Sequence, residues 1–193
     1  MQIDLHKPIL DKNDRLAEEN RELFREKKVF VLDLLASPGS GKTSTILATI
    51  EALRDEFNIA VIEGDIACHL ESAMIRRAVD VLDLDNLDLI IIENVGNLVC
   101  PTDFDLGESM KAMILSVPEG DDKPLKYPGV FQAASAIVLN KIDTAPVFNF
   151  DQELFYEHIK NLNPTAPIFP MSATNGKGVD AWAEWLADQI RSL

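Results

Sequence analysis

ASPGSGKT, residues 36–43, follows an apolar run over residues 29–35 and leads into a segment with helical periodicity, residues 43–53. Strand, glycine-containing loop and helix in this order form the context that a phosphate-binding P-loop requires. Gly39 and Gly41 let the backbone turn so that its N–H groups converge on phosphate oxygens. Ala36 stands where the general pattern G-x-x-x-x-G-K-[ST] has its first glycine. The alternative is an ordinary glycine loop that caps a helix.

The same loop carries the side chains that we expect to act on the phosphates. Lys42 supplies a point charge for the outer phosphates and is a candidate catalytic residue, and the hydroxyl of Thr43 is a ligand suited to Mg²⁺. The start of the helix adds a positive dipole end. The residues expected to contact the nucleotide here are Gly39, Ser40, Gly41, Lys42, Thr43 and Ser44.

Length and charge limit the classes of function. The 193 residues suit one globular domain, with a leader and surface helix over residues 1–28 and a P-loop domain over residues 29–193. The formal net charge of −14 argues against nucleic-acid binding and against docking on anionic membranes. No apolar run reaches membrane-spanning length, and no signal peptide is visible at Met1. Two cysteines form no disulfide framework, so we expect a cytoplasmic location.

Apolar runs alternate with helical segments along the whole chain. Continuous apolar strands that alternate with helices indicate an α/β fold with a mostly parallel sheet and helices on both faces. Asn13 is expected to cap an N-terminal helix that runs to about Lys28. The expected strands are residues 29–35, 59–62, 89–92, 113–117, 136–139 and 168–171, and the other expected helices are residues 43–53, 70–82, 152–162 and 179–190.

Carboxylates follow the second and third expected strands. Asp65 and Glu93 each stand where a strand beside the P-loop ends. An acidic residue in that place holds Mg²⁺ directly or through water, so we predict both as magnesium ligands together with Thr43, and as catalytic residues. The alternative for each is a helix cap or a turn residue.

Asn140-Lys141-Ile142-Asp143, after the fifth expected strand, indicates a guanine site. The Asp143 carboxylate can accept two hydrogen bonds from guanine, whereas adenine lacks that pair of donors. The stem of Lys141 can lie along the base. Ser172 and Ala173 follow the sixth strand, where their N–H groups are expected to face the base carbonyl. We therefore predict that GTP and GDP bind in preference to ATP.

Cys68, His69 and Cys100 follow two strands of the same face. Two thiolates and an imidazole suit Zn²⁺ or Ni²⁺. The spacing alone favours the alternative, two buried structural thiols and a surface histidine.

Several longer motifs resemble the HypB family of hydrogenase nickel-incorporation GTPases. The resemblance implies the fold of the SIMIBI class of P-loop GTPases, GTP hydrolysis and a GTP-dependent homodimer. It also implies help in loading nickel into the large subunit of [NiFe] hydrogenase, together with other maturation proteins. The residues that match Cys68, His69 and Cys100 form a metal site near the subunit interface in that family. The motifs are ENVGNLVCP (residues 93–101), FDLGE (104–108), EGDDKP (119–124), NKID (140–143) and CHL (68–70).

The sequence departs from that family in two places. Residues 1–12 contain no cysteine-rich or histidine-rich nickel motif, and only Ile66 and Ala67 separate Asp65 from Cys68, where the family has a longer segment. Either that segment is deleted or this sequence omits it. Two alternatives stay open: a urease-type nickel accessory GTPase, which accounts less well for ENVGNLVCP, and a P-loop kinase with structural cysteines.

Overall fold

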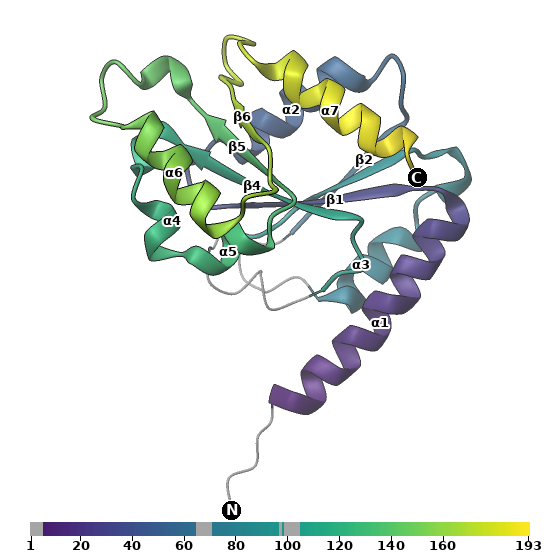
Figure 1. Cartoon of the computed structure of the whole chain (residues 1–193). Helices are drawn as coiled ribbons and strands as arrows, with labels where there is room; N and C mark the ends of the chain where they lie inside the picture. The colour runs from purple at the N-terminus through teal and green to yellow at the C-terminus, as the bar shows by residue number, and fades with distance from the viewer. Residues whose placement is uncertain (1–5, 65–70, 97, 99–104) are drawn as a thin grey trace, which may run out of the picture.

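The sheet is formed by six strands, and every neighbouring pair is parallel (Figure 1). The structure is a computed structural model that describes residues 6–64, 71–96, 98 and 105–193. The strand order is β2-β3-β1-β4-β5-β6. The strands are β1 Phe30–Ala36, β2 Ile59–Glu63, β3 Leu89–Glu93, β4 Met110–Ser116, β5 Ala136–Asn140 and β6 Ile168–Pro170.

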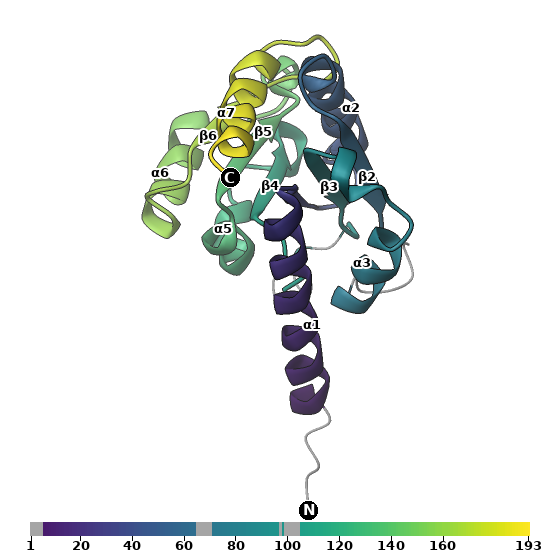
Figure 2. The same cartoon turned by 90° about the vertical axis from the view of Figure 1, so that its right-hand side faces the viewer.

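Helices cover both faces of the sheet, as the sequence predicts. Helices α2 and α7 pack on one face, whereas α1, α3, α5 and α6 pack on the other (Figures 1 and 2). Within the described residues, no helix is both long and apolar enough to span a membrane. The helices are α1 His6–Lys27, α2 Lys42–Leu53, α3 Ser72–Val79, α4 Lys123–Lys126, α5 Pro128–Ala133, α6 Gln152–Leu162 and α7 Val179–Arg191, with 3₁₀ turns η1 Leu84–Asn86, η2 Val117–Glu119 and η3 Ile142–Thr144.

The central strand β1 marks the point where the strand order reverses. Its neighbours are β3 on one side and β4 on the other, with Leu34 opposite Glu93 and Ala36 opposite Ile114. In open α/β sheets, ligands bind beyond the carboxyl ends of the strands at such a point. The topology therefore places a site where β1 leads into the P-loop.

The face covered by α2 and α7 contains the largest side chain buried in the sheet core. Trp182 of α7 is fully buried against Leu32 and Leu34, and its Nε1 donates a hydrogen bond of 2.9 Å to the hydroxyl of Thr49 in α2. An indole buried with its N–H satisfied contributes its full apolar surface to stability. This contact fixes α2, which begins at the P-loop, against α7.

Helix α1 begins at His6, so the prediction that Asn13 caps it is wrong. Asn13 lies inside the helix with 5% of its surface exposed. Its Oδ1 accepts hydrogen bonds of 2.9 Å from both the N–H and the hydroxyl of Ser72, and its Nδ2 donates to the carbonyl of Asp105 at 2.8 Å. Asparagine competes with the helical backbone when its side chain is free, but here the side chain has tertiary partners.

Two turns further along, Asn20 makes a second tie between α1 and the same two turns. Its Nδ2 donates to the carbonyls of Ser72 and Leu106, each at 3.1 Å. Gly107 has φ +85° and lies so close to α1 that a Cβ there would be 2.5 Å from the carbonyl oxygen of Ala17. The α1 helix extends away from the sheet at its N-terminal end (Figure 2), but its second half is packed into the protein.

The domain boundary between residues 28 and 29 stays a prediction.

Smaller differences from the prediction have local causes. Strand β4 begins at Met110, three residues before the expected start. The predicted start was late because the charged Lys111 interrupts the apolar run on which the prediction relied. Helices α4 and α5 were not predicted. Each is six residues or shorter and begins with a proline in its first two positions, so neither shows a helical period in the sequence.

We predict that Asn20→Ala lowers the free energy of unfolding by about 1–3 kcal/mol, because it removes two buried hydrogen bonds, to the carbonyls of Ser72 and Leu106. Urea denaturation followed by circular dichroism measures this change. The control is Glu19→Ala, since Glu19 is an exposed neighbour on the same helix. Equal stability of the two variants would show that the Asn20 amide does not hold the two turns.

Candidate nucleotide-binding site

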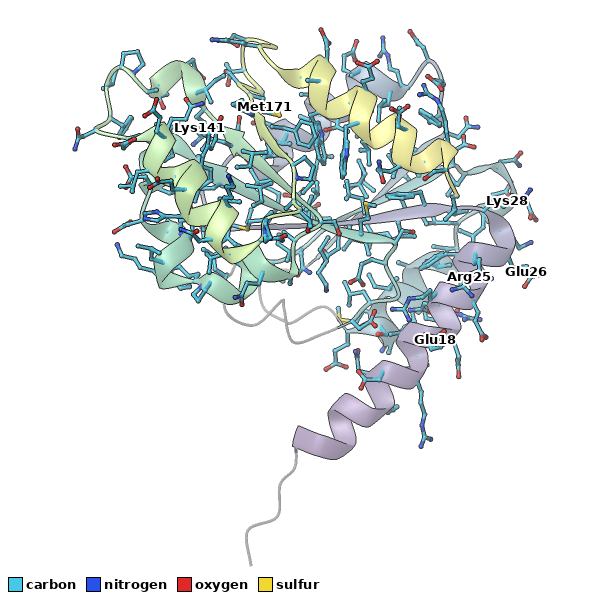
Figure 3. All side chains as sticks on the ribbon, viewed as in Figure 1. Glu18, Arg25, Glu26, Lys28, Lys141 and Met171 are labelled. Carbon is cyan, nitrogen blue, oxygen red and sulfur yellow. The ribbon has the colours of Figure 1, made fainter. Side chains whose placement is uncertain are left out.

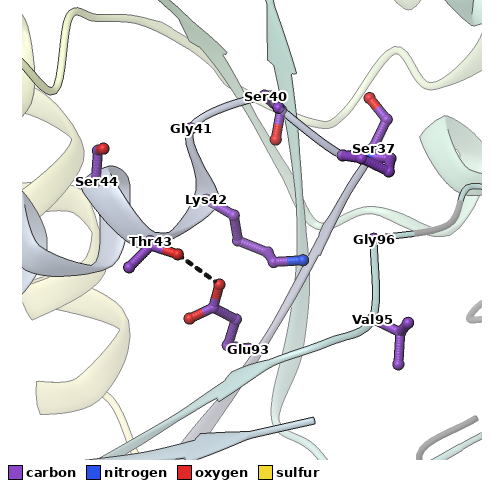
Figure 4. A pocket seen from close by; sticks show the side chains of 11 residues that line it. Ser37, Ser40, Gly41, Lys42, Thr43, Ser44, Glu93, Val95 and Gly96 are labelled. Carbon is purple, nitrogen blue, oxygen red and sulfur yellow. Dashed lines mark hydrogen bonds between the residues drawn. The ribbon is translucent and has the colours of Figure 1, made fainter. Parts of the chain in front are cut away.

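The P-loop joins the end of β1 to the start of α2 and lines a cavity of about 500 Å³ (Figure 4). Gly39 and Gly41 have φ angles of +79° and +91°, in the left-handed region that glycine enters without strain. The cavity is lined by residues 37–44, Glu93, Val95 and Gly96. All six predicted nucleotide-contacting residues of the loop, 39–44, therefore border one cavity.

The side chain of Asn140 fixes the P-loop to the guanine motif. Its Nδ2 donates to the carbonyl of Ser40 at 3.0 Å, and its Oδ1 accepts from the N–H of Lys141 at 2.8 Å and of Ala173 at 3.1 Å. A Cβ on Gly41 would lie 2.5 Å from that Nδ2, so only glycine fits beneath the amide. The Nζ of Lys141 donates to the carbonyl of Gly39 at 2.6 Å.

Asp143 is exposed on η3, two residues after Lys141, whose side chain contacts the P-loop. This turn is connected to β6 because the N–H of Ile142 donates to the carbonyl of Met171 at 3.2 Å, and Lys141 and Met171 are neighbours in Figure 3. The N–H groups of Ser172 and Ala173 were expected to face a base. Instead, Ser172 donates to Lys177 at 2.8 Å and Ala173 to Asn140. The N–H of Ala173 thus helps to fix the Asn140 side chain, and a contact of these two residues with a base stays a prediction.

Two of the three predicted magnesium ligands meet at the start of α2. The hydroxyl of Thr43 donates to Oε1 of Glu93 at 2.8 Å (Figure 4). A hydroxyl and a carboxylate oxygen on adjacent elements fit the donor set that Mg²⁺ prefers. The third predicted ligand, Asp65, lies outside the described residues.

Lys42 extends across the cavity, and its Nζ donates to the carbonyl of Asn94. Burial lowers the pKa of Lys42, and the nearby carboxylates of Glu93 and Asp33 oppose that effect. The cationic form is the one that binds phosphate oxygens.

Glu119 is a site residue that the sequence reasoning missed. Its Oε1 accepts from the hydroxyl of Ser37 at the start of the P-loop, while its Oε2 accepts from the N–H and the hydroxyl of Ser116, each at 2.8 Å. The only signal in the sequence was its place in the EGDDKP motif. The end of β4 is thereby tied to the P-loop.

Two buried hydroxyls in the described chain lack a hydrogen-bond partner, those of Ser40 and Ser172. Buried polar groups are almost always bonded in folded proteins, and exceptions gather at functional sites. Both serines flank Asn140, so both exceptions lie at this candidate site.

Asp33 is a fully buried carboxylate in the middle of β1, and the sequence reasoning missed it too. Asn94 donates its Nδ2 to both carboxylate oxygens, at 3.0 and 3.2 Å, and the Nζ of Lys111 lies 3.7 Å away. Burial raises the pKa of Asp33 to about 7, with Lys111 opposing the rise and Glu108 adding to it. A lone acidic residue within an apolar strand was the available signal.

The described residues contain no group of three or more histidine, cysteine, aspartate or glutamate side chains placed to hold a metal ion. Cys68, His69 and Cys100, the predicted site for Ni²⁺ or Zn²⁺, all lie outside the described residues.

The nucleotide site and the sheet match a known family. Residues 63–170 match the family model for the CobW/HypB/UreG nucleotide-binding domain. Over 204 residues, the chain is 46% identical to the hydrogenase maturation factor HypB of Escherichia coli K12, covering 94% of this chain and 70% of that protein. The chain belongs to the HypB family of P-loop GTPases.

Solved HypB structures share the fold. HypB from Archaeoglobus fulgidus has a TM-score of 0.87 at 40% identity, over 93% of this chain and 99% of that one. HypB from Helicobacter pylori, solved in complex with nickel, also has a TM-score of 0.87, at 39% identity over 94% of this chain and 96% of that one. A curated H. pylori HypB, named a hydrogenase/urease maturation factor, is 40% identical over 95% of this chain and 86% of its own length. The predicted fold class is confirmed.

We predict that the free energy of unfolding of the parent protein falls, relative to that of the Asp33→Asn variant, as the pH rises from 5.5 to 8. The folded pKa of Asp33 is about 7, above the ordinary 3.8, so the folded state binds more protons than the unfolded state in this range and loses stability as they leave. The expected relative loss is about 2 kcal/mol, at 1.4 kcal/mol per pKa unit.

Urea denaturation at pH 5.5 and 8, above the isoelectric point of 4.5, measures this loss for the parent and for Asp33→Asn. Asp88→Asn, which changes a carboxylate at the opposite end of the strands, controls for a general loss of charge. Parallel pH profiles for the parent and Asp33→Asn would contradict the prediction.

Proposed function

We propose that this HypB-family chain is a GTP-hydrolysing metallochaperone that assists nickel insertion into [NiFe] hydrogenase. The observation that carries the guanine specificity is the Asn140 amide, which joins the Ser40 carbonyl of the P-loop to the NKID turn. This junction supports a single site in which one element binds phosphates and the other reads a base.

In the proposed site, Asp143 accepts hydrogen bonds from guanine and Lys141 lies along the base. Lys42 neutralises the outer phosphates, and the backbone of residues 39–44 surrounds them. Thr43 and Glu93, with Asp65, would hold Mg²⁺, which neutralises the charge that develops on the phosphates during hydrolysis. The contact between Thr43 and Glu93 supports that assignment.

The nickel role is supported by relatives. A H. pylori HypB was solved in complex with nickel, and relatives are named for hydrogenase or for hydrogenase and urease maturation. In this chain we propose Cys68, His69 and Cys100 as the site for Ni²⁺ cargo, with Zn²⁺ as a competitor, because soft thiolates bind both ions. We place the site at a GTP-dependent homodimer interface, in the cytoplasm, where other maturation proteins and the hydrogenase large subunit receive the metal.

We predict that Asp143→Asn weakens GTP binding and shifts preference towards xanthosine triphosphate, because the hydrogen-bonding pattern reverses at one edge of the base. Competition against a fluorescent GDP analogue measures both affinities, with ATP as the reference for base selectivity. Asp14→Asn, at an exposed position of α1, is the matched control. GTP affinity equal to that of the parent would exclude Asp143 from base reading.

We predict that nucleotide and metal binding are coupled by about 1–3 kcal/mol, which is roughly a 5- to 150-fold change in affinity and must be reciprocal. Ni²⁺ and Zn²⁺ are titrated with GDP and with a non-hydrolysable GTP analogue, while the mass of the assembly is followed by light scattering. Identical metal affinities in the two nucleotide states, or full affinity in Cys68→Ala/Cys100→Ala, would contradict the coupling or the proposed ligands.

A further inference from the structure

We propose that Asp33 is a positioning residue for the P-loop lysine and that it acts through Asn94. The proposal rests on the phosphate-binding role of Lys42 given under the proposed function. In this proposal, the buried Asp33 carboxylate contributes to the GTPase reaction without contacting the nucleotide.

The first step is the place of Asp33 in the sheet. Val31 and Leu35, its neighbours on the same face of β1, belong to two separate apolar clusters, one under α1 and α3 and the other under α5 and α6. Asp33 lies between them with none of its surface exposed. A carboxylate in such a place is unfavourable unless it is hydrogen-bonded or paired.

The second step is the way in which Asn94 is held. Its side-chain amide donates to both oxygens of Asp33, its Oδ1 accepts from the N–H of Val95 at 2.8 Å, and its own N–H donates to the carbonyl of Leu34 at 3.3 Å. Asn94 is 5% exposed. With the side chain and both flanking N–H groups engaged, the carbonyl of Asn94 has one orientation, and it faces Lys42.

The third step is the balance of charge behind Asp33. Lys111 lies directly opposite Asp33 on β4, and its Nζ also contacts Glu108 at 2.8 Å. Glu108 in turn accepts from the N–H of Leu106 at 2.8 Å. Two carboxylates therefore flank one partly buried ammonium group, and the Asp33 oxygens stay available to the Asn94 amide.

These contacts give Lys42 a fixed acceptor within the cavity. A lysine side chain has four rotatable bonds, so holding its head group reduces the freedom that it loses when it binds phosphate. Removing the acceptor at Asp33 frees the Asn94 peptide to rotate and its carbonyl to leave Lys42. Binding of the outer phosphates is then weakened, whereas binding of the base and of the first phosphate is not.

The experiment compares Asp33→Leu, which has no acceptor, with Asp33→Asn, which keeps one oxygen for the Asn94 amide. Competition binding measures affinities for GDP and GMP, and steady-state kinetics give kcat and KM for GTP. We expect Asp33→Leu to lose about 10- to 100-fold in GDP affinity and in kcat/KM, as for the loss of one hydrogen bond to a charged group. Its GMP affinity should be unchanged, and Asp33→Asn should behave as the parent does.

A second variant and a control protect against a simple folding defect. Asn94→Leu removes the middle group while Asp33, Lys111 and Glu108 stay intact, and it should reproduce the selective loss of GDP affinity. Asn163→Ala removes three hydrogen bonds to carbonyls at the C-terminal end of α5, so it should lose stability but keep both nucleotide affinities. Equal losses for GDP and GMP in Asp33→Leu or Asn94→Leu, or no loss for either, would overturn the proposal. So would an Asp33→Asn protein as defective as Asp33→Leu.

The Lys42→Ala background separates this inference from the proposed function. Lys42→Ala is expected to lower GDP affinity towards that of GMP, and adding Asp33→Leu should then change neither affinity. An additive loss in the double variant would overturn the link between Asp33 and Lys42 alone. A Lys42→Ala protein that binds GDP as the parent does would instead reject the phosphate-binding role of Lys42.

Discussion

The nucleotide site depends on one side-chain amide, that of Asn140. Its two polar atoms make three hydrogen bonds, which join its own NKID turn to the P-loop and to the turn after β6. An alternative partner in water is excluded because Asn140 is 1% exposed. The geometry of Gly41 follows from this contact, since any side chain there would displace the amide. Phosphate binding and base reading are thereby built on a single rigid junction.

A second polar group, Asp33, shows what a buried charge requires of its surroundings. Its carboxylate is accommodated because Asn94, after β3, donates to it and Lys111, on β4, lies beside it, while Glu108 pairs with the same lysine. Networks of this kind specify one arrangement of the strands, since partial satisfaction is costly in a low dielectric. That arrangement also orients the carbonyl of Asn94 towards Lys42.

Much of this could be predicted from sequence because the signals are local. The six strands are predominantly apolar, with Asp33 in β1 and Lys111 in β4 as exceptions, and the P-loop and NKID turn are short motifs at strand ends. The helical role of Asn13, the tie from Glu119 to Ser37 and the contacts of Asp33 could not be predicted, because each depends on a partner between 59 and 92 residues away that only the fold supplies. Nor does a short motif indicate that the N–H groups of Ser172 and Ala173 donate to the carbonyl of Lys177 and to the side chain of Asn140.

The amide of Asn20 has a mechanical consequence. One NH₂ group bonds the carbonyls of Ser72 and Leu106, each at 3.1 Å, and the hydroxyl of Ser72 donates directly to the carbonyl of Asp105 at 2.7 Å, so the two turns are linked both to α1 and to each other. In the sequence, Ser72 follows His69 by three residues, and Leu106 follows Cys100 by six. A displacement of one turn would therefore disturb the other, because α1 anchors both of the turns that follow the cysteines in the sequence.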